Sequence, residues 1–244
     1  MTLSDPTSQL ITDLESAALS AGFAVSQFGQ IQDWPLLAFT RQGKRQDGQA
    51  IYLSAGIHGD EPAGPQAILE LLVANEFSSE YTYYLCPVLN PFGLSQGIRE
   101  NAQGIDLNRD YRDFRSPEIQ AHRDWFEQSG IRSLSQCIHL HEDWESRGFY
   151  LYELNFHQAA SLAPRILQAV SEHMPIETAT EIDGRPAQAG IIRPESIPEI
   201  EEGHPEAIYF QQKFGGLNYT LETPSALSIR SRVEAHKAAV LAMR

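Results

Sequence analysis

The chain has few cysteines and no excess of basic residues. Its 244 residues include only Cys86 and Cys137, each within an apolar run typical of a strand. This pattern favours buried free thiols over a disulfide-rich secreted scaffold or a cysteine-based metal site, and leaves one disulfide between the two open. The 18 Lys and Arg face 32 Asp and Glu, a formal net charge of −14. Because nucleic acids and anionic lipids attract proteins through Lys and Arg, we expect neither nucleic acid nor membrane as a partner.

Long apolar runs, internal repeats and a signal peptide are also missing. The N-terminal residues 1–6 show no basic start, and no segment approaches the length of a membrane span. We therefore expect a soluble cytoplasmic protein. With 42% apolar residues, a chain of 244 residues is long enough to bury a substantial core. The expectation is a single domain that spans residues 1–244.

Short apolar runs alternate with segments of helical periodicity along the chain. Strands are predicted near Ala50–Gly56, Tyr81–Val88, Leu134–Leu140 and Gly216–Leu221. This alternation favours an α/β fold whose twisted sheet is mixed but mostly parallel, with helices on both faces. Two polar segments, 90–115 and 177–206, are predicted to be loops. A loop as long as the first is commonly functional.

The stretch His58-Gly59-Asp60-Glu61 directly follows the first of these strands and precedes Pro62. An imidazole nitrogen and a carboxylate oxygen can converge on one metal ion from such a strand-to-helix turn. Pro62 supports this geometry, because it disfavours the α region for Glu61 and suits the start of a helix. A single His-x-x-Glu is weak evidence in a chain with eight His, so the rest of the sequence has to decide.

Further polar clusters follow later strands, where they would line a shared cleft. The segment 90–115 carries Arg99, Asp106, Asn108 and Arg109. A guanidinium fork matches a carboxylate with two hydrogen bonds, which Lys does not reproduce. The alternative is that both arginines pair with acidic neighbours on a solvated loop.

Two more candidates lie at the ends of predicted strands. His139 and His141 share one face of a strand, and Glu222 ends another strand just before a proline. Glu222 alone is also explained as an acid that interacts with the dipole of the helix after it. The other five histidines lie on predicted helices or in the acidic segment 177–206, where surface positions explain them.

Taken in this order, the motifs resemble those of the zinc carboxypeptidase superfamily, which includes carboxypeptidase A, bacterial murein peptide amidases, and the desuccinylases and aspartoacylases. The resemblance covers about Ala50 to Pro224. It implies one zinc ion per chain, bound by His58, Glu61 and His141. His139 stays open as an alternative third ligand, although the alignment favours His141.

The same resemblance implies roles for the other candidates. Asp106 would hold the imidazole of His58, which fixes its tautomer. Arg99 would polarise the scissile carbonyl, and Asn108 and Arg109 would bind a free α-carboxylate. Glu222 would act as the general base toward metal-activated water.

We therefore expect a zinc-dependent, metallocarboxypeptidase-like hydrolase that cleaves a C-terminal peptide or peptide-like amide bond. Its substrate would be a small peptide or N-acyl amino acid with a free carboxylate. One alternative is an N-acyl amino acid hydrolase of the desuccinylase or aspartoacylase type, and another is a catalytically silent binding protein on the same scaffold. Tyr150, Tyr209 and Tyr219 compete as a tyrosine that covers the substrate.

Overall fold

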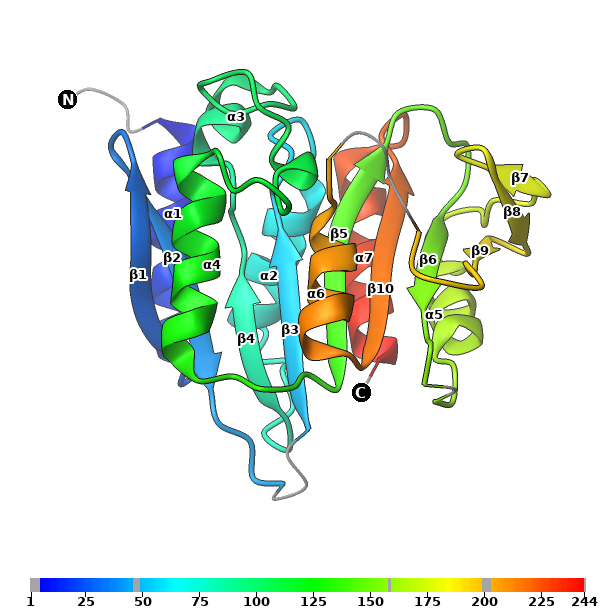
Figure 1. The fold of residues 1–244 in the computed structure, drawn as a ribbon, viewed down its shortest axis with the longest axis horizontal. Helices are drawn as coiled ribbons and strands as arrows, with labels where there is room; N and C mark the ends of the chain where they lie inside the picture. The colour runs from blue at the N-terminus through cyan, green and yellow to red at the C-terminus, as the bar shows by residue number, and fades with distance from the viewer. Residues whose placement is uncertain (1–4, 46–48, 158, 199–202, 244) are drawn as a thin grey trace.

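The computed structural model describes residues 5–45, 49–157, 159–198 and 203–243, and arranges them around one ten-stranded sheet (Figure 1). The strands are β1 (Ala24–Ile31), β2 (Trp34–Arg41), β3 (Ala50–Ala55), β4 (Thr82–Cys86), β5 (Gln136–Asp143), β6 (Tyr150–Leu154), β7 (Glu181–Ile182), β8 (Arg185–Gln188), β9 (Ile191–Ile192) and β10 (Leu217–Pro224). The helices are α1 (Pro6–Ser20), α2 (Ala63–Val73), α3 (Pro91–Gln96), the 3-10 turn η1 (Leu107–Arg109), α4 (Pro117–Ser129), α5 (Ala163–Val170), α6 (Glu206–Phe214) and α7 (Ile229–Ala242).

The sheet is mixed, which corrects part of the expected fold. The strand order is β1-β2-β4-β3-β5-β10-β6-β9-β8-β7. Parallel pairing holds in the centre, from β4 through β3 and β5 to β10, and between β6 and β9. The other pairs are antiparallel, so the prediction of a mostly parallel sheet is wrong.

The antiparallel pairs have a local cause. Only Gln32 and Asp33 separate β1 from β2, and a connection this short can join only antiparallel strands. At the other edge, the segment 177–206 was expected to be a loop but contains β7, β8 and β9 in hairpins. The predicted α/β class and the mixed character of the sheet are confirmed.

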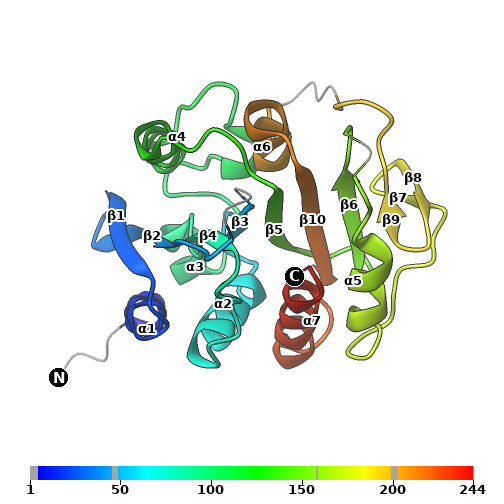
Figure 2. The ribbon, with the colours of Figure 1, turned by 90° about the horizontal axis from the view of Figure 1, so that it is seen from below.

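Helices cover both faces of the sheet. Figure 2 shows α4 and α6 on one face and α1, α2, α5 and α7 on the other. Alternate residues of β5 serve the two sides: Ile138 and Leu140 join the core under α2 and α7, while Cys137 joins the core under α4 and α6. His139 and His141 therefore share the face of Cys137. Both cysteines are buried and free.

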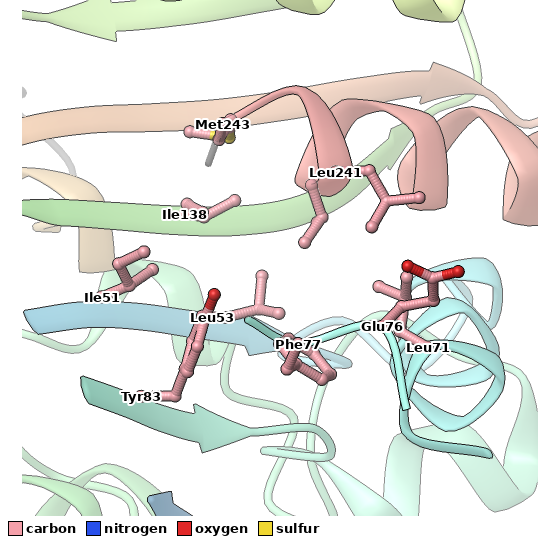
Figure 3. A pocket seen from close by; sticks show the side chains of 10 residues that line it. Ile51, Leu53, Leu71, Glu76, Phe77, Tyr83, Ile138, Leu241 and Met243 are labelled. Carbon is pink, nitrogen blue, oxygen red and sulfur yellow. The ribbon is translucent and has the colours of Figure 1, made fainter. Parts of the chain in front are cut away.

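A small void inside the larger core is distinct from any binding site. Apolar side chains such as Ile51, Leu53 and Ile138 line it near the end of α7 (Figure 3). Its volume is about 10 Å³, room for roughly one water molecule, so it is a packing gap that cannot hold a substrate.

The segment 90–115 is more ordered than its composition predicted, because short helices and side-chain caps organise it. The Asn90 carboxamide oxygen accepts from the Gly93 amide at 2.8 Å and begins α3. The amide end of Asn90 donates to the Arg99 carbonyl at 3.1 Å. At α4, the Ser116 side chain caps the helix and Pro117 lies in its first turn. Within the described ranges, no helix has the length and apolar character needed to cross a membrane.

Candidate active site

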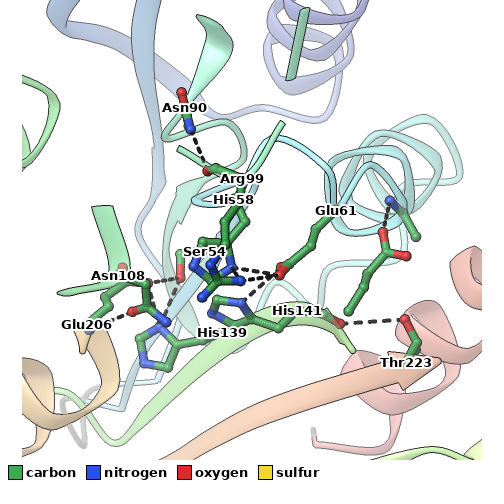
Figure 4. Close-up of polar contacts among 12 residues, drawn as sticks. Ser54, His58, Glu61, Asn90, Arg99, Asn108, His139, His141, Glu206 and Thr223 are labelled. Carbon is green, nitrogen blue, oxygen red and sulfur yellow. Dashed lines mark hydrogen bonds and ion pairs between the residues drawn. The ribbon is translucent and has the colours of Figure 1, made fainter. Parts of the chain in front are cut away.

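His58, Glu61 and His141 converge where the central parallel strands end (Figure 4). His58 follows β3, Glu61 lies just before α2, and His141 is in β5. The Glu61 carboxylate lies between the two rings, with Oε1 2.6 Å from Nδ1 of His58 and Oε2 2.9 Å from Nδ1 of His141. One donor atom from each residue lies within 4.8 Å of the others, and all three side chains are buried.

This donor set fits a catalytic metal ion. Two imidazole nitrogens and a carboxylate oxygen are ligands that zinc accepts, and three protein ligands leave one position for water or substrate. Both rings turn the same atom, Nδ1, toward the shared carboxylate. Asp106 contacts the other ring nitrogen of His58, Nε2, on the edge that faces away from Glu61 and His141. This contact fixes the orientation of the His58 ring.

Asp106 connects three neighbours at once. Its Oδ1 lies 3.2 Å from Nε2 of His58 and accepts from the Asn108 amide at 2.9 Å, while Oδ2 accepts from Arg99 at 3.0 Å. Burial lowers the pKa of His58, but the charges of Glu61 and the hydrogen bond to Asp106 outweigh burial and raise it to about 9. The carboxylate of Asp106 thus supports the basicity of His58 as well as its orientation.

Arg99 pairs with Asp106 and also reaches the triad. Its guanidinium nitrogen Nη1 lies 3.3 Å from Nδ1 of His58 and 3.8 Å from Oε1 of Glu61. Its backbone carbonyl accepts from both Asn90 and the Gly59 amide, which ties the loop to the metal-site turn. Arg99 thus pairs with an acidic neighbour, as the alternative interpretation of the sequence expected. The same ion pair directs its guanidinium toward the candidate metal site.

His139 lies apart from the triad. Its Nδ1 is 2.9 Å from Oε2 of Glu206 and 2.9 Å from Oγ of Ser54, beneath α6. Both histidines face the same side of the sheet, but His141 is two residues nearer the carboxyl end of β5. The turn that carries His58 lies at that end. The structure thus brings His141, rather than His139, to His58 and Glu61.

Glu222 of β10 is the register partner of His141 in β5 and of Tyr150 in β6. It lines the same cleft as the triad. Within the described part of the chain, no hydrogen bond or ion pair engages its carboxylate. Burial, together with the charges of Glu61 and Asp143, raises the pKa of Glu222 well above its ordinary value. A perturbed, unpaired carboxyl beside a metal triad is typical of a proton-transferring group.

The cleft has a volume of about 580 Å³, a size common for small-molecule sites. The metal triad, Arg99, Asn108 and Arg109 line one part of it. Tyr150 and Tyr152 line the opposite part, toward β7 and β8. Of the three tyrosines considered from the sequence, Tyr150 contacts the cleft, whereas Tyr219 is buried and donates to Glu153 on the far side of the sheet. Tyr209 packs against Tyr111 and Phe114.

Three buried polar residues were missed by sequence reasoning. His122 and His236 were assigned to the surface, yet both are fully buried. Glu206 was counted as the end of an acidic loop, but it begins α6 and is 1% exposed. Pro205 before an acid is a helix-start signal that could have placed Glu206 on a helix. Its buried partners come from β3 and β5, which no local pattern reveals.

Comparison with known proteins agrees with this geometry. Residues 47–194 match the family model of the succinylglutamate desuccinylase/aspartoacylase catalytic domain. Carboxypeptidase SOL1 of Arabidopsis thaliana is 30% identical over 115 residues, which are 38% of this chain and 23% of that protein. The chain thus spans about a quarter of the length of this curated relative.

Solved structures share the fold. A proposed metallopeptidase from Shewanella denitrificans superimposes with a TM-score of 0.83 at 21% identity, covering 97% of this chain and 88% of its own. A metallo-carboxypeptidase from Burkholderia cenocepacia gives a TM-score of 0.68 at 18% identity, over 95% of this chain and 66% of its own. The family model covers more than half of the chain, and the fold shared with these solved structures extends over nearly all of it. The chain belongs to the succinylglutamate desuccinylase/aspartoacylase catalytic-domain family, one of the groups that its motifs resemble.

Proposed function

We propose that the protein is a zinc-dependent hydrolase that removes a C-terminal residue from a small peptide or peptide-like amide. The observation that carries this proposal is the convergence of His58, Glu61 and His141 beside the unpaired carboxyl of Glu222. Family membership supports a hydrolase of the metallocarboxypeptidase or desuccinylase/aspartoacylase type. The metal, the bond and the substrate are our inference.

Zinc, when bound by His58, Glu61 and His141, would acidify a water molecule and polarise a carbonyl oxygen. Glu222 would accept a proton on its carboxylate and pass it to the leaving nitrogen, a role open to a partly buried carboxyl with a raised pKa. The Arg99 guanidinium, held by Asp106, would stabilise negative charge on the carbonyl oxygen.

Asn108 and Arg109 would bind the free carboxylate of the substrate. Both line the cleft on the side of Arg99. Among the described residues, the Arg109 guanidinium donates to the Asn108 carbonyl at 3.0 Å, and the other N–H donors of its fork would bind the carboxylate. The same cleft of about 580 Å³ extends to Tyr150 and Tyr152, and the acyl side of the substrate would lie there.

A second candidate is hydrolysis of an N-acyl amino acid. It is favoured by the family model, which describes desuccinylase and aspartoacylase catalytic domains. Both candidates use the same metal ligands, the same base and a substrate with a free carboxylate, and they differ in the size of the acyl group.

Matched substrates test the proposal. The zinc-loaded protein is assayed with N-blocked dipeptides that end in a free carboxylate, with their C-terminal amides, and with N-acetyl and N-succinyl amino acids. We expect cleavage of the free-acid dipeptides, a large loss with the amides, and no activity after chelation. Faster cleavage of the N-acyl amino acids would favour the second candidate, and no cleavage of any of them by zinc-loaded protein would contradict both.

We also propose that the protein acts in the cytoplasm on small substrates, without nucleic acid or membrane partners. The support for the absence of these partners is the net charge of −14, which repels both kinds of polyanion. Binding to DNA or to anionic vesicles at physiological salt would contradict this.

A further inference from the structure

A buried carboxylate lies behind the candidate active site, on the same face of the sheet. Glu206 accepts from the Tyr52 hydroxyl at 2.7 Å and from the Ser54 hydroxyl at 2.9 Å, and lies 2.9 Å from Nδ1 of His139. Burial raises the pKa of Glu206, but its interactions with His139, His122 and Tyr52 lower it to about 2. The group is therefore an ionised acceptor, and the ring nitrogen of His139 must be the donor.

The network extends from Glu206 to a second buried ring. The Tyr52 hydroxyl lies 3.0 Å from Nε2 of His122, and the Tyr111 hydroxyl lies 2.8 Å from Nδ1 of the same ring. These side chains come from β3, β5, α4 and α6, except Tyr111, which lies in the segment 90–115. An ionised carboxylate in the protein interior destabilises the folded state unless its hydrogen-bond partners stay in place. The network around Glu206 therefore fixes the start of α6 against the sheet.

The start of α6 in turn holds the loop that carries the proposed carboxylate binders. The backbone N–H of Glu206 donates to Oδ1 of Asn108 at 2.9 Å. Two residues earlier, His204 exchanges backbone hydrogen bonds with Arg109 and Tyr111, at 2.8 and 3.2 Å. Segment 204–206 therefore clamps segment 108–111 at three points, and Glu206 anchors the clamp in the core.

The bond to Asn108 also determines which way its carboxamide faces. A backbone N–H can pair only with the carboxamide oxygen, so the NH₂ end of Asn108 is the end left for the cleft. A substrate carboxylate needs donors, and an amide turned the other way would present an oxygen to it. The clamp thus selects the orientation of Asn108 that can bind an anion.

We propose that Glu206 is a positioning residue for the substrate carboxylate, acting through the start of α6 on the carboxamide of Asn108. This inference rests on the proposed function, because it assumes that Asn108 binds that carboxylate. Glu206 itself does not line the cleft and touches no metal ligand among the described residues.

The test is Glu206→Gln. This substitution keeps the size of the side chain, but its NH₂ group would face the hydroxyl and ring N–H donors that the carboxylate now accepts from. For each protein we compare kcat/KM for a free-acid substrate with that for its C-terminal amide. We expect this ratio to fall about tenfold in the variant, mainly through KM of the free acid, while zinc content and amide cleavage stay unchanged. A second variant, Tyr52→Phe, removes one hydrogen bond without adding a donor, and should shift the ratio in the same direction if Glu206→Gln does not fold.

Glu153→Gln is the matched control. Glu153 is also buried and accepts from Ser161, Arg193 and Tyr219, but it faces away from the cleft. This variant should lose stability and keep the substrate ratio. A ratio that is unchanged in both Glu206→Gln and Tyr52→Phe, or equal losses on acid and amide, would overturn the inference. A wild-type protein without preference for the free acid would instead refute the carboxylate site itself.

Discussion

Glu222 lines the same cleft as the metal triad, but among the described residues it makes no hydrogen bond or ion pair with the three ligands, so it can be changed without altering one of them. We predict that Glu222→Gln lowers kcat by about 10²–10⁴-fold, the usual contribution of a general acid–base, because the amide cannot take up the proton. Zinc content should stay at the wild-type level. Glu145→Gln, at an exposed acid of the same cleft, is the control and should keep its activity. Undiminished kcat in Glu222→Gln would remove Glu222 from the mechanism.

Arg109 provides a second residue-scale prediction. Arg109→Lys keeps the positive charge but loses the planar fork, so KM for free-acid substrates should rise about tenfold, with a smaller effect on kcat. Steady-state kinetics with the acid and its amide measure this. An equal rise of KM for the amide would show that Arg109 does not bind the carboxylate.

The histidines show what residue patterns can and cannot predict. The period of a strand placed His139 and His141 on one face, and that expectation agrees with the structure. Which of the two histidines lies beside His58 depends on where the turn after β3 and the start of α6 pack against β5. These are contacts between segments 80 and 67 residues apart in sequence, and no local pattern encodes them.

At the scale of elements, the turn that carries His58 packs directly on α3. A Cβ atom at Gly59 would lie 1.9 Å from the carbonyl carbon of Gly93 and 2.2 Å from the amide of Leu94. We predict that Gly59→Ala pushes the turn away from α3, lowers the melting temperature and reduces zinc occupancy. Metal analysis and thermal unfolding check this.

Gly97→Ala is the control for that substitution. Gly97 ends α3 with a φ of +63° but has open space around its Cβ position. This variant should lose about 1 kcal/mol of stability from backbone strain and keep its zinc. Full zinc occupancy in Gly59→Ala would mean that the turn does not depend on its contact with α3.

Elements were predictable where burial alone defines them. β3, β4 and β5 are apolar runs flanked by polar residues, and the sequence located all three. The hairpins formed by β7, β8 and β9 were not predicted, because this segment is rich in polar residues and its strands are only two to four residues long. Strands this short depend on pairing with a neighbour rather than on their own composition: β9 pairs with β6, β8 with β9, and β7 with β8.

At the scale of the whole molecule, buried histidine couples stability to pH. Burial lowers the pKa of His122 from 6.5 to about 4. Between these values the unfolded chain binds a proton that the folded protein excludes, so the contribution of neutral His122 is full above pH 6.5 and declines as the pH falls toward 4. We predict that His122→Gln, which cannot titrate, flattens the pH dependence by about 1.4 kcal/mol per pH unit near pH 5.

Denaturant unfolding of both proteins from pH 4 to 7, at equal zinc, measures that difference. If the free energy of unfolding changes with pH to the same extent in both proteins, His122 is charged in the folded state or open to water. His122 also explains a limit of sequence reading. It lies on a helix whose outer face is polar, and only the tertiary packing of α4 on β3 shows that it is buried.

The central claim is that His58, Glu61 and His141 bind one zinc ion, and elemental analysis of purified protein tests it most directly. Wild type is compared with His58→Ala, His141→Ala and His139→Ala, each after zinc is added back and excess is removed. We expect about one zinc per chain in wild type and in His139→Ala, and loss of zinc in the other two. Wild-type protein that stays without metal, or zinc that persists in His141→Ala but not in His139→Ala, would contradict the account.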